Sequence, residues 1–493
     1  MRVTRLHTAR SPPATATTTP PARGAPLCVD LDGTLIKSDL MVETLLHWLK
    51  ANPFRLFVAL VWWARGRARL KSELASRVEL DVAHLPVNDA VLEWLREQRR
   101  DGRKIVLCTS ANQRVAEQVA AHLNLFDHVI ASDSTHNLSG RAKAERLVAE
   151  FGQRGYDYVG NEAKDLHVWE CAQKAIVVAD RAHIERWRHK IGALDRAFEI
   201  EPASPRDWLS ALRIHQWAKN ILLLAPLASA HRLTDLGALA DVAIAFLLFG
   251  CCASGTYLIN DLLDLDADRR HPRKCLRALA SGRIALTQAT AVAVALICGS
   301  VALAIMTLPS LFTLVLTLYI ATTLWYSFVL KLIAMVDVLS LAGLYTLRVL
   351  AGSAAALVVP SFWLLGFSVF LFLSLATAKR YAELRSLLDA GLDRASGRDY
   401  SVTDLPLLHS FGTAAGYVCV LVFALYVNLA APGVYSRPHI MWLVCPLLLY
   451  WISRVWLKTF RGQMLMDPVV FALTDRPSLA VGILAAALVL AAI

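Results

Sequence analysis

Long apolar segments separated by short charged loops fill the chain from residue 211 to residue 493. A helix needs roughly 20 mostly apolar residues to cross a bilayer. The hydrocarbon core offers no hydrogen-bond partners to backbone N–H and C=O groups, so apolar segments of this length must fold as helices. We predict an all-α membrane bundle of about nine transmembrane helices, near residues 214–231, 237–260, 286–307, 309–330, 334–357, 361–378, 411–431, 438–457 and 478–493.

The first part of the chain is more polar, and the overall composition of 56% hydrophobic and 18% charged residues averages the two parts. Residues 1–25 are rich in Thr, Pro and Ala and lack an apolar core, so we expect a disordered lead and no signal peptide. We predict a soluble domain over residues 26–200 and a membrane domain over residues 205–493.

The net charge of +11 does not suggest a nucleic-acid partner, because the basic residues flank apolar segments and form no stripe with aromatic residues. Loops on the side of the soluble domain carry most of the Lys and Arg, whereas the opposite loops contain only Arg232 and Arg437. The positive-inside rule then places the soluble domain in the cytoplasm of a bacterial-type plasma membrane. The nine cysteines include no CxxC pair, as expected for a reduced protein.

The stretch INDLLDLDADRRHPRK (259–274) follows the second span. If the helix continues, Asp261, Asp264 and Asp268 share one face, with Asn260 beside them and Asp266 pointing elsewhere. Carboxylates on one face repel each other unless a cation lies between them, and Mg²⁺ bridging a diphosphate is suited to such oxygen ligands. The alternative is that these aspartates and the following basic residues neutralise one another in a solvated loop.

The segment from Asn260 to Gly282 resembles the first aspartate-rich motif of the UbiA-type prenyltransferase superfamily, NDxxDxxxD. Its usual trailing R-P-x-x-x-G is here Arg277-Ala278, ending at Gly282. The resemblance implies a helical bundle with a lipid-accessible cavity, in which Asn260, Asp261, Asp264 and Asp268 hold Mg²⁺ and the three aspartates are catalytic.

Later segments resemble the decaprenyl-phosphate phosphoribosyltransferase branch of that superfamily: RIHQWAKN (213–220), YSFVLKLIAMVDVLSLAGLYTLRVLAGS (326–353), ATAKRYAELRSL (376–387) and MDPVVFALTDRP (466–477). This resemblance implies phosphoribosyl pyrophosphate as donor and a polyprenyl phosphate as acceptor. The expected substrate-binding residues are Lys219, Asn260, Arg269, Lys274, Arg277, Tyr326, Lys331, Asp337, Arg348, Lys379 and Arg380. Alternatively, Arg348 pairs with Asp337 to hold the bundle, and Lys379 and Arg380 only extend to the membrane surface.

The soluble domain contains LCVDLDGTL (27–35), an apolar strand that ends in two aspartates and a Gly-Thr turn. It resembles the haloacid dehalogenase superfamily of phosphotransferases, which implies a doubly wound α/β domain with a helical cap at about residues 38–90. The implied catalytic residues are Asp30 (nucleophile), Asp32 (acid/base), Thr109 and Lys143, and the implied metal ligands are Asp30, Asp32 and Asp165. Asn161 stands where the family usually has Asp, so a scaffold that only binds phosphorylated ligands is an alternative to an active phosphatase.

The fusion suggests that the phosphatase removes the 5-phosphate of the transferase product. One competing hypothesis is transfer of a prenyl group from a prenyl diphosphate to an aromatic or other small acceptor. Another is a transporter with a regulatory phosphate-binding domain. The paired Trp62 and Trp63 of the cap either touch the bilayer surface or pack inside the cap.

Overall fold

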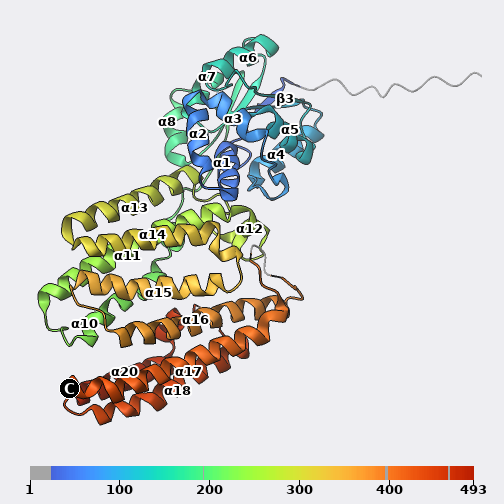
Figure 1. Ribbon diagram of the computed structural model, residues 1–493. Coiled ribbons are helices and arrows are strands. Elements are labelled where there is room, and N and C mark those ends of the chain that lie inside the picture. Colours follow the sequence, from blue (N-terminus) through green and yellow to red (C-terminus); the bar gives the residue numbers. More distant parts are fainter. Residues whose placement is uncertain (1–23, 193, 395–397, 465–466) are drawn as a thin grey trace, which may run out of the picture. The chain divides into compact units, whose positions relative to one another are not determined.

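A computed structural model describes residues 24–192, 194–394, 398–464 and 467–493 (Figure 1). The predicted lead lies almost wholly outside the described residues. The chain forms two compact units. The first contains residues up to Ile36, Gly66–Ala75 and Val87–Glu201, and the second contains Lys37–Arg65, Ser76–Pro86 and Pro202–Ile493. The predicted cap is therefore divided between the units, since only its residues 66–75 and 87–90 belong to the first.

The first unit is a doubly wound α/β fold around a six-stranded sheet whose paired strands run parallel, in the order β3-β2-β1-β4-β5-β6. The strands are β1 (Leu27–Val29), β2 (Ile105–Asn112), β3 (His128–Ser132), β4 (Asp157–Gly160), β5 (Lys174–Ala179) and β6 (Leu194–Glu199). The strand order reverses between β1 and β4, and ligands of such folds bind beyond the carboxyl ends of the strands at this point. All three residues of β1 are fully buried, as expected of a central parallel strand.

Helices connect these strands, as parallel pairing requires. They are α3 (Arg67–Ala75), α4 (Asp89–Arg100), α5 (Gln113–Leu123), α6 (Arg141–Phe151), α7 (Leu166–Trp169) and α8 (Arg181–Arg188). The α/β class predicted from the sequence is confirmed.

The second unit contains seven helices long and apolar enough to cross a membrane among the described residues, or eight if a bent pair counts as one span. They are α11 (Leu236–Leu263), α13 (Leu286–Thr307), α14 (Ser310–Phe328), α15 (Val336–Ala355), α16 (Phe362–Asp389), Val402–Leu429, which contains α17 (Leu405–Leu429), and Pro438–Phe460, which contains α18 (Val444–Phe460). The bent pair is α19 (Pro468–Thr474) and α20 (Arg476–Ala492), at 77°. Figure 1 shows the long helices running alongside one another. The chain is an integral membrane protein.

The predicted count of nine spans was only approximate. The first candidate, residues 214–231, folds as a 3-10 helix η3 (Ile214–Leu224) followed by the short helix α10 (Ala225–Ser229). Pro226 lies in the first turn of α10, where its missing N–H costs nothing, whereas inside one continuous helix it would remove a hydrogen bond. The last candidate, residues 478–493, lies in the second half of the bent pair.

Shorter elements of the second unit are α1 (Leu40–Ala51), α2 (Arg55–Ala64), η1 (Val82–His84), α9 (Pro205–Ala211), α12 (Leu265–Arg270) and η4 (Lys274–Leu276). Asp39 caps α1 by accepting hydrogen bonds from the amides of Met41 and Val42. Ser204 and Asp207 form a reciprocal capping box at the start of α9.

Candidate functional site

The aspartate motif spans the junction of α11 and α12. The amide of Asp264 donates to Asn260 O (3.0 Å) and that of Asp268 donates to Asp264 O (2.8 Å), so helical hydrogen bonding continues through the junction. Asp261 and Asp268 are thus two turns apart on one face. Both are buried, and both lie near one guanidinium nitrogen: Arg277 Nη1 is 3.3 Å from Asp261 Oδ1 and 2.6 Å from Asp268 Oδ2. A cation therefore fits between these two carboxylates.

The other polar residues of the motif have separate partners. Asp264 accepts hydrogen bonds from Lys331 Nζ (2.9 and 3.1 Å) and from Asn260 (3.1 Å). Asp266 faces His47 of α1 at 2.8 Å, in agreement with its predicted position off the shared face. The three-aspartate cluster predicted from spacing is therefore a close pair, with Asp264 held by Lys331.

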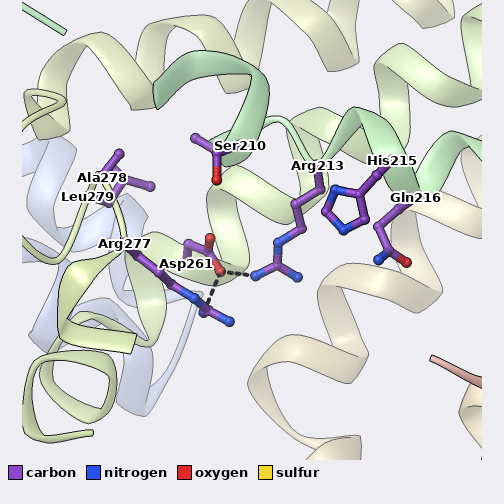
Figure 2. Close-up of a pocket in the computed structure, with 9 residues that line it drawn as sticks. Ser210, Arg213, His215, Gln216, Asp261, Arg277, Ala278 and Leu279 are labelled. Carbon is purple, nitrogen blue, oxygen red and sulfur yellow. Dashed lines mark hydrogen bonds and ion pairs between the residues drawn. The ribbon is translucent and has the colours of Figure 1, made fainter. Parts of the chain in front are cut away.

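A cavity of about 280 Å³ opens beside Asp261 (Figure 2). Arg213 Nη2 lies 2.5 Å from Asp261 Oδ1, and Figure 2 shows Arg213 and Arg277 converging on this carboxylate. The lining residues are Ser210, Ala211, Arg213, His215, Gln216, Asp261, Arg277, Ala278 and Leu279. Because Asp261 is the only acid among them, the cavity suits an anionic ligand.

A second basic cluster surrounds Asp467, for which the sequence predicted no role. Asp467 Oδ2 accepts hydrogen bonds from Lys219 (2.7 Å) and Lys379 (3.1 Å), and Tyr345 donates to it at 3.1 Å. Asp467 and Lys219 are almost completely buried, and one carboxylate faces two ammonium groups. Asp467 also caps α19 by accepting a hydrogen bond from the amide of Val469. An Asp directly before a Pro that starts a helix was the one feature of the sequence that could have predicted this cap.

The two buried arginines have different surroundings. Arg348 donates to Tyr319 Oη (3.0 Å) and Leu344 O (2.9 Å), and its guanidinium lies over the rings of Phe249 and Tyr345.

Asp337 pairs with Arg380 rather than with Arg348: Arg380 Nε is 2.7 Å from Asp337 Oδ2, and neither side chain is exposed.

Asp337 also accepts a hydrogen bond from Tyr326 (2.8 Å), and Glu383 contacts Arg380. This closed network joins α15 to α16 and favours a structural role for Asp337 and Arg380.

The remaining predicted residues lie near the motif. Lys274 is exposed on η4. Arg269 makes a two-point ion pair with Glu43 of α1, at 2.8 and 2.6 Å, and both side chains are buried. Arg269 thus binds a protein carboxylate and is not directed at a ligand.

Mg²⁺ fits the oxygen donors of the motif. Within the part of the chain that the structure describes, no three His, Cys, Asp or Glu side chains are placed to hold a metal ion. The position of Arg277 Nη1 between Asp261 and Asp268 nevertheless marks a place where a cation contacts two carboxylates. Asp261 and Asp268 would hold the ion, with Asn260 and Asp264 next to them.

The first unit brings the predicted phosphatase residues together at the carboxyl ends of β1 and β4. Lys143 Nζ lies 2.8 Å from Asp30 Oδ1 and 3.9 Å from Asp165 Oδ1. Burial raises the pKa of Asp30 to about 6 although Lys143 opposes the shift. Lys143 also donates to Tyr158 Oη (2.8 Å), which donates to Asp165 (2.9 Å). Tyr158 was not predicted, because a strand tyrosine is usually a core residue.

The loop with Asn161 closes this site. The amides of Asn161 and Glu162 both donate to Asp165 Oδ2 at 3.0 Å, which fixes its carboxylate. Thr34 donates to Asn161 Oδ1 (3.1 Å), so Asn161 holds the DxDGT turn. Gly33 in that turn has φ +73°, and a Cβ there would lie 2.1 Å from Asn161 Nδ2.

Threonine and lysine side chains complete the first unit's site. Thr109 is fully buried and accepts a hydrogen bond from the amide of Ala111 (3.0 Å). Asp32 is half-buried in the turn after β1. Lys71 of α3 donates to Ser110 O (2.6 Å) and Asn137 Oδ1 (3.1 Å), which places its ammonium group at the end of β2. Lys71 was missed, because a lysine in a helical cap carries no distinguishing sequence signal.

Comparison with known proteins identifies both units. Residues 221–471 match the model of the UbiA prenyltransferase family. The chain belongs to this family. Residues 27–168 match the haloacid dehalogenase-like hydrolases, so this UbiA-family membrane transferase carries a haloacid dehalogenase-like phosphatase domain. Both resemblances stated from the sequence are confirmed.

Two curated relatives and one solved structure illustrate the similarity. "Uncharacterized protein y4nM" of Sinorhizobium fredii is 37% identical over 467 residues, which are 94% of this chain and 90% of that protein. Decaprenyl-phosphate phosphoribosyltransferase of Mycobacterium tuberculosis is 37% identical over 221 residues, 44% of this chain and 73% of that protein. A UbiA homologue from Archaeoglobus fulgidus bound to GPP and Mg²⁺ aligns with a TM-score of 0.44 and 20% identity, over 57% of this chain and 96% of that one.

Proposed function

We propose that the membrane domain transfers 5-phosphoribosyl from phosphoribosyl pyrophosphate to a polyprenyl phosphate. The observation that carries this proposal is that basic side chains gather in two places, Arg213 and Arg277 at the cavity beside Asp261, and Lys219 and Lys379 around Asp467. A prenyl diphosphate has one charged end, whereas the proposed donor has a diphosphate and a 5-phosphate and the proposed acceptor has another phosphate. The similarity to decaprenyl-phosphate phosphoribosyltransferases over the UbiA part supports the same donor.

In the proposed reaction the bond between ribose C1 and the pyrophosphate oxygen breaks, and a phosphate oxygen of the lipid forms a new bond to C1. Arg213 and Arg277 bind the departing diphosphate, and Lys219 and Lys379 bind a second phosphate. The chemistry that Mg²⁺ supplies when bound at Asp261 and Asp268 is neutralisation of diphosphate charge. The lipid phosphate is already an anion, so no general base is needed. Charge stabilisation and positioning carry the catalysis.

We further propose that the phosphatase domain removes the 5-phosphate of the lipid product. Asp30 attacks the phosphorus, the bond to the ribose 5-oxygen breaks, and Asp32 protonates that oxygen. Water then releases phosphate from the aspartyl phosphate. Lys143 holds Asp30 in place and offsets phosphoryl charge. Mg²⁺ at Asp30, Asp32 and Asp165 would further neutralise the phosphoryl group. We place both sites on the cytoplasmic side of a bacterial plasma membrane, on the basis of the basic loops.

Donor identity is tested with the full chain in nanodiscs that contain a polyprenyl phosphate and Mg²⁺. We expect pyrophosphate release from phosphoribosyl pyrophosphate only when the lipid phosphate is present, and none from Asp261→Asn. The matched control is Asp266→Asn, which changes an aspartate of the same motif that faces His47. Turnover of a prenyl diphosphate with a small aromatic acceptor, and none of phosphoribosyl pyrophosphate, would overturn the proposal in favour of prenyl transfer.

A further inference from the structure

Helix α2 of the second unit is apolar on nearly all sides and exposed. Its sequence is RLFVALVWWA, and Ala59 is its only buried residue. The exposed apolar side chains of the helix, with Phe54 directly before it, are Phe54 (68%), Leu56 (45%), Phe57 (67%), Val58 (43%), Leu60 (50%), Val61 (51%) and Trp63 (57%). A contiguous apolar surface of this kind marks a binding site for a protein or a membrane, and a helix apolar all round normally lies buried.

The helix is firmly attached to the unit that contains the membrane spans. Trp62 stacks on Trp48 of α1 with ring centroids 4.8 Å apart, and Arg55 Nη1 donates to Trp48 O at 3.2 Å. Helix α1 is in turn joined to α12 by the buried Glu43–Arg269 ion pair at 2.6 Å. The His47–Asp266 contact at 2.8 Å is a second link. The exposed surface is therefore held close to the end of a transmembrane helix.

We propose that α2 lies in the headgroup region of the bilayer and buries its apolar side chains at the acyl boundary. Ten residues at 1.5 Å per residue give a length of about 15 Å, too short for a core of about 30 Å. A helix of this length lies on the membrane rather than across it. Exposed Trp63 fits this position, since tryptophan is enriched at membrane interfaces.

The charges around α2 favour lipid over a protein partner. Within the second unit, the segment from Thr44 to Arg65 contains no acidic residue, whereas Arg55 and Arg65 lie in or directly after the helix. Basic residues beside an apolar helix are attracted to the phosphates and anionic headgroups of a cytoplasmic leaflet. A protein partner would instead need a matching acidic surface.

The test places an environment-sensitive NBD fluorophore on Phe57→Cys in the full chain, with the partly exposed Cys171, Cys251, Cys275 and Cys298 replaced by serine. The protein is reconstituted in nanodiscs of phosphatidylcholine and phosphatidylglycerol, with and without nitroxide-labelled lipid. Leu314→Cys on span α14, which is 64% exposed, is the lipid-facing reference. Glu97→Cys on the charged face of α4 is the water-facing reference.

We expect Phe57→Cys to show blue-shifted emission and to be quenched by the nitroxide lipid, as Leu314→Cys is, whereas Glu97→Cys is not. Emission like that of Glu97→Cys would mean that α2 is in water and would overturn the proposal. Blue-shifted emission without nitroxide quenching would mean that a protein surface, from a second copy or from elsewhere in the chain, covers α2, and would also overturn it. Coincident size-exclusion profiles of the labelled variants confirm that each is folded.

Discussion

Replacing Asp467 by Asn tests the buried charge cluster in the membrane domain. Asp467 is the carboxylate that accepts from both Lys219 (2.7 Å) and Lys379 (3.1 Å), and Lys219 is only 6% exposed at its side chain. Removing one partner of a buried ion pair costs about 3–5 kcal/mol, because the remaining charge is left without compensation. Asn keeps the capping oxygen for the amide of Val469, so the change reports the charge and not the cap.

Asp475→Asn is the matched control. Asp475 also caps a helix, through the amide of Ser478, and pairs with Arg454 at 2.6 Å. Both side chains remain partly exposed, at 12% for Asp475 and 15% for Arg454, so solvent screens the loss. We expect this control to cost less than Asp467→Asn, because the Arg454–Asp475 pair is more exposed than the Lys219–Asp467 pair.

The assay is thermal unfolding of the two purified variants in detergent, followed by tryptophan fluorescence. We expect Asp467→Asn to lower the melting temperature by several degrees and Asp475→Asn to lower it much less. Equal melting temperatures for Asp467→Asn and wild type would refute the reasoning, since they would show that Lys219 and Lys379 do not depend on this carboxylate.

Other predictions concern single contacts. Glu43→Gln should destabilise the protein by about 3–5 kcal/mol, because it leaves the buried Arg269 unpaired. Adding Arg269→Met to the same chain should recover part of that loss. Additive effects of the two changes in thermal unfolding would contradict this pairing. Lys219→Met should raise KM for phosphoribosyl pyrophosphate or the lipid phosphate by about 10-fold or more in steady-state kinetics, whereas Lys274→Met, an exposed lysine, should change it little. Burial raises the pKa of Asp30 to about 6, so its nucleophilic carboxylate forms as the pH rises through that value. The phosphatase rate should therefore increase with pH in this range, and added Mg²⁺ should move the increase to lower pH. A flat pH–rate profile from pH 4 to 7 with and without Mg²⁺ would contradict this.

Local sequence patterns predicted most of the architecture. Apolar runs of spanning length located α11, α13, α14, α15 and α16, and the DxDGT turn after an apolar strand located the end of β1. The failure at residues 214–231 came from counting apolar residues without weighing Pro226, which starts a new helix. The missing N–H of proline, rather than a change in hydropathy, separates η3 from α10 at Pro226.

The site was predicted less completely, because its pairings join residues far apart in the chain. Spacing on one face correctly separated Asp266 from Asp261 and Asp268, which is a local property of a helix. No local signal shows that Lys331 reaches Asp264, that Asp467 lies between Lys219 and Lys379, or that Arg380 and not Arg348 pairs with Asp337. The phosphatase positions were easier, since the carboxyl ends of parallel strands meet at one edge of the sheet.

The division of the predicted cap could not be foreseen. Helix α1 has an ordinary cap and apolar pattern, and its contacts with the membrane unit, such as Glu43 with Arg269 and His47 with Asp266, join residues far apart in sequence. The exposed apolar surface of α2 was visible in the sequence only as two tryptophans with two possible environments. Trp62 packs on Trp48, and Trp63 is exposed.

The most direct test is mass spectrometry of lipids after the full chain has been incubated with Mg²⁺, phosphoribosyl pyrophosphate and a polyprenyl phosphate. We expect wild type to yield a ribosylated polyprenyl phosphate without its 5-phosphate, Asp30→Asn to accumulate the phosphoribosyl lipid, and Asp261→Asn to yield neither. A phosphoribosyl lipid that persists with wild type while other phosphomonoesters are hydrolysed would disprove the coupling of the two domains. No ribosylated lipid from folded wild-type protein would contradict the proposed transfer itself.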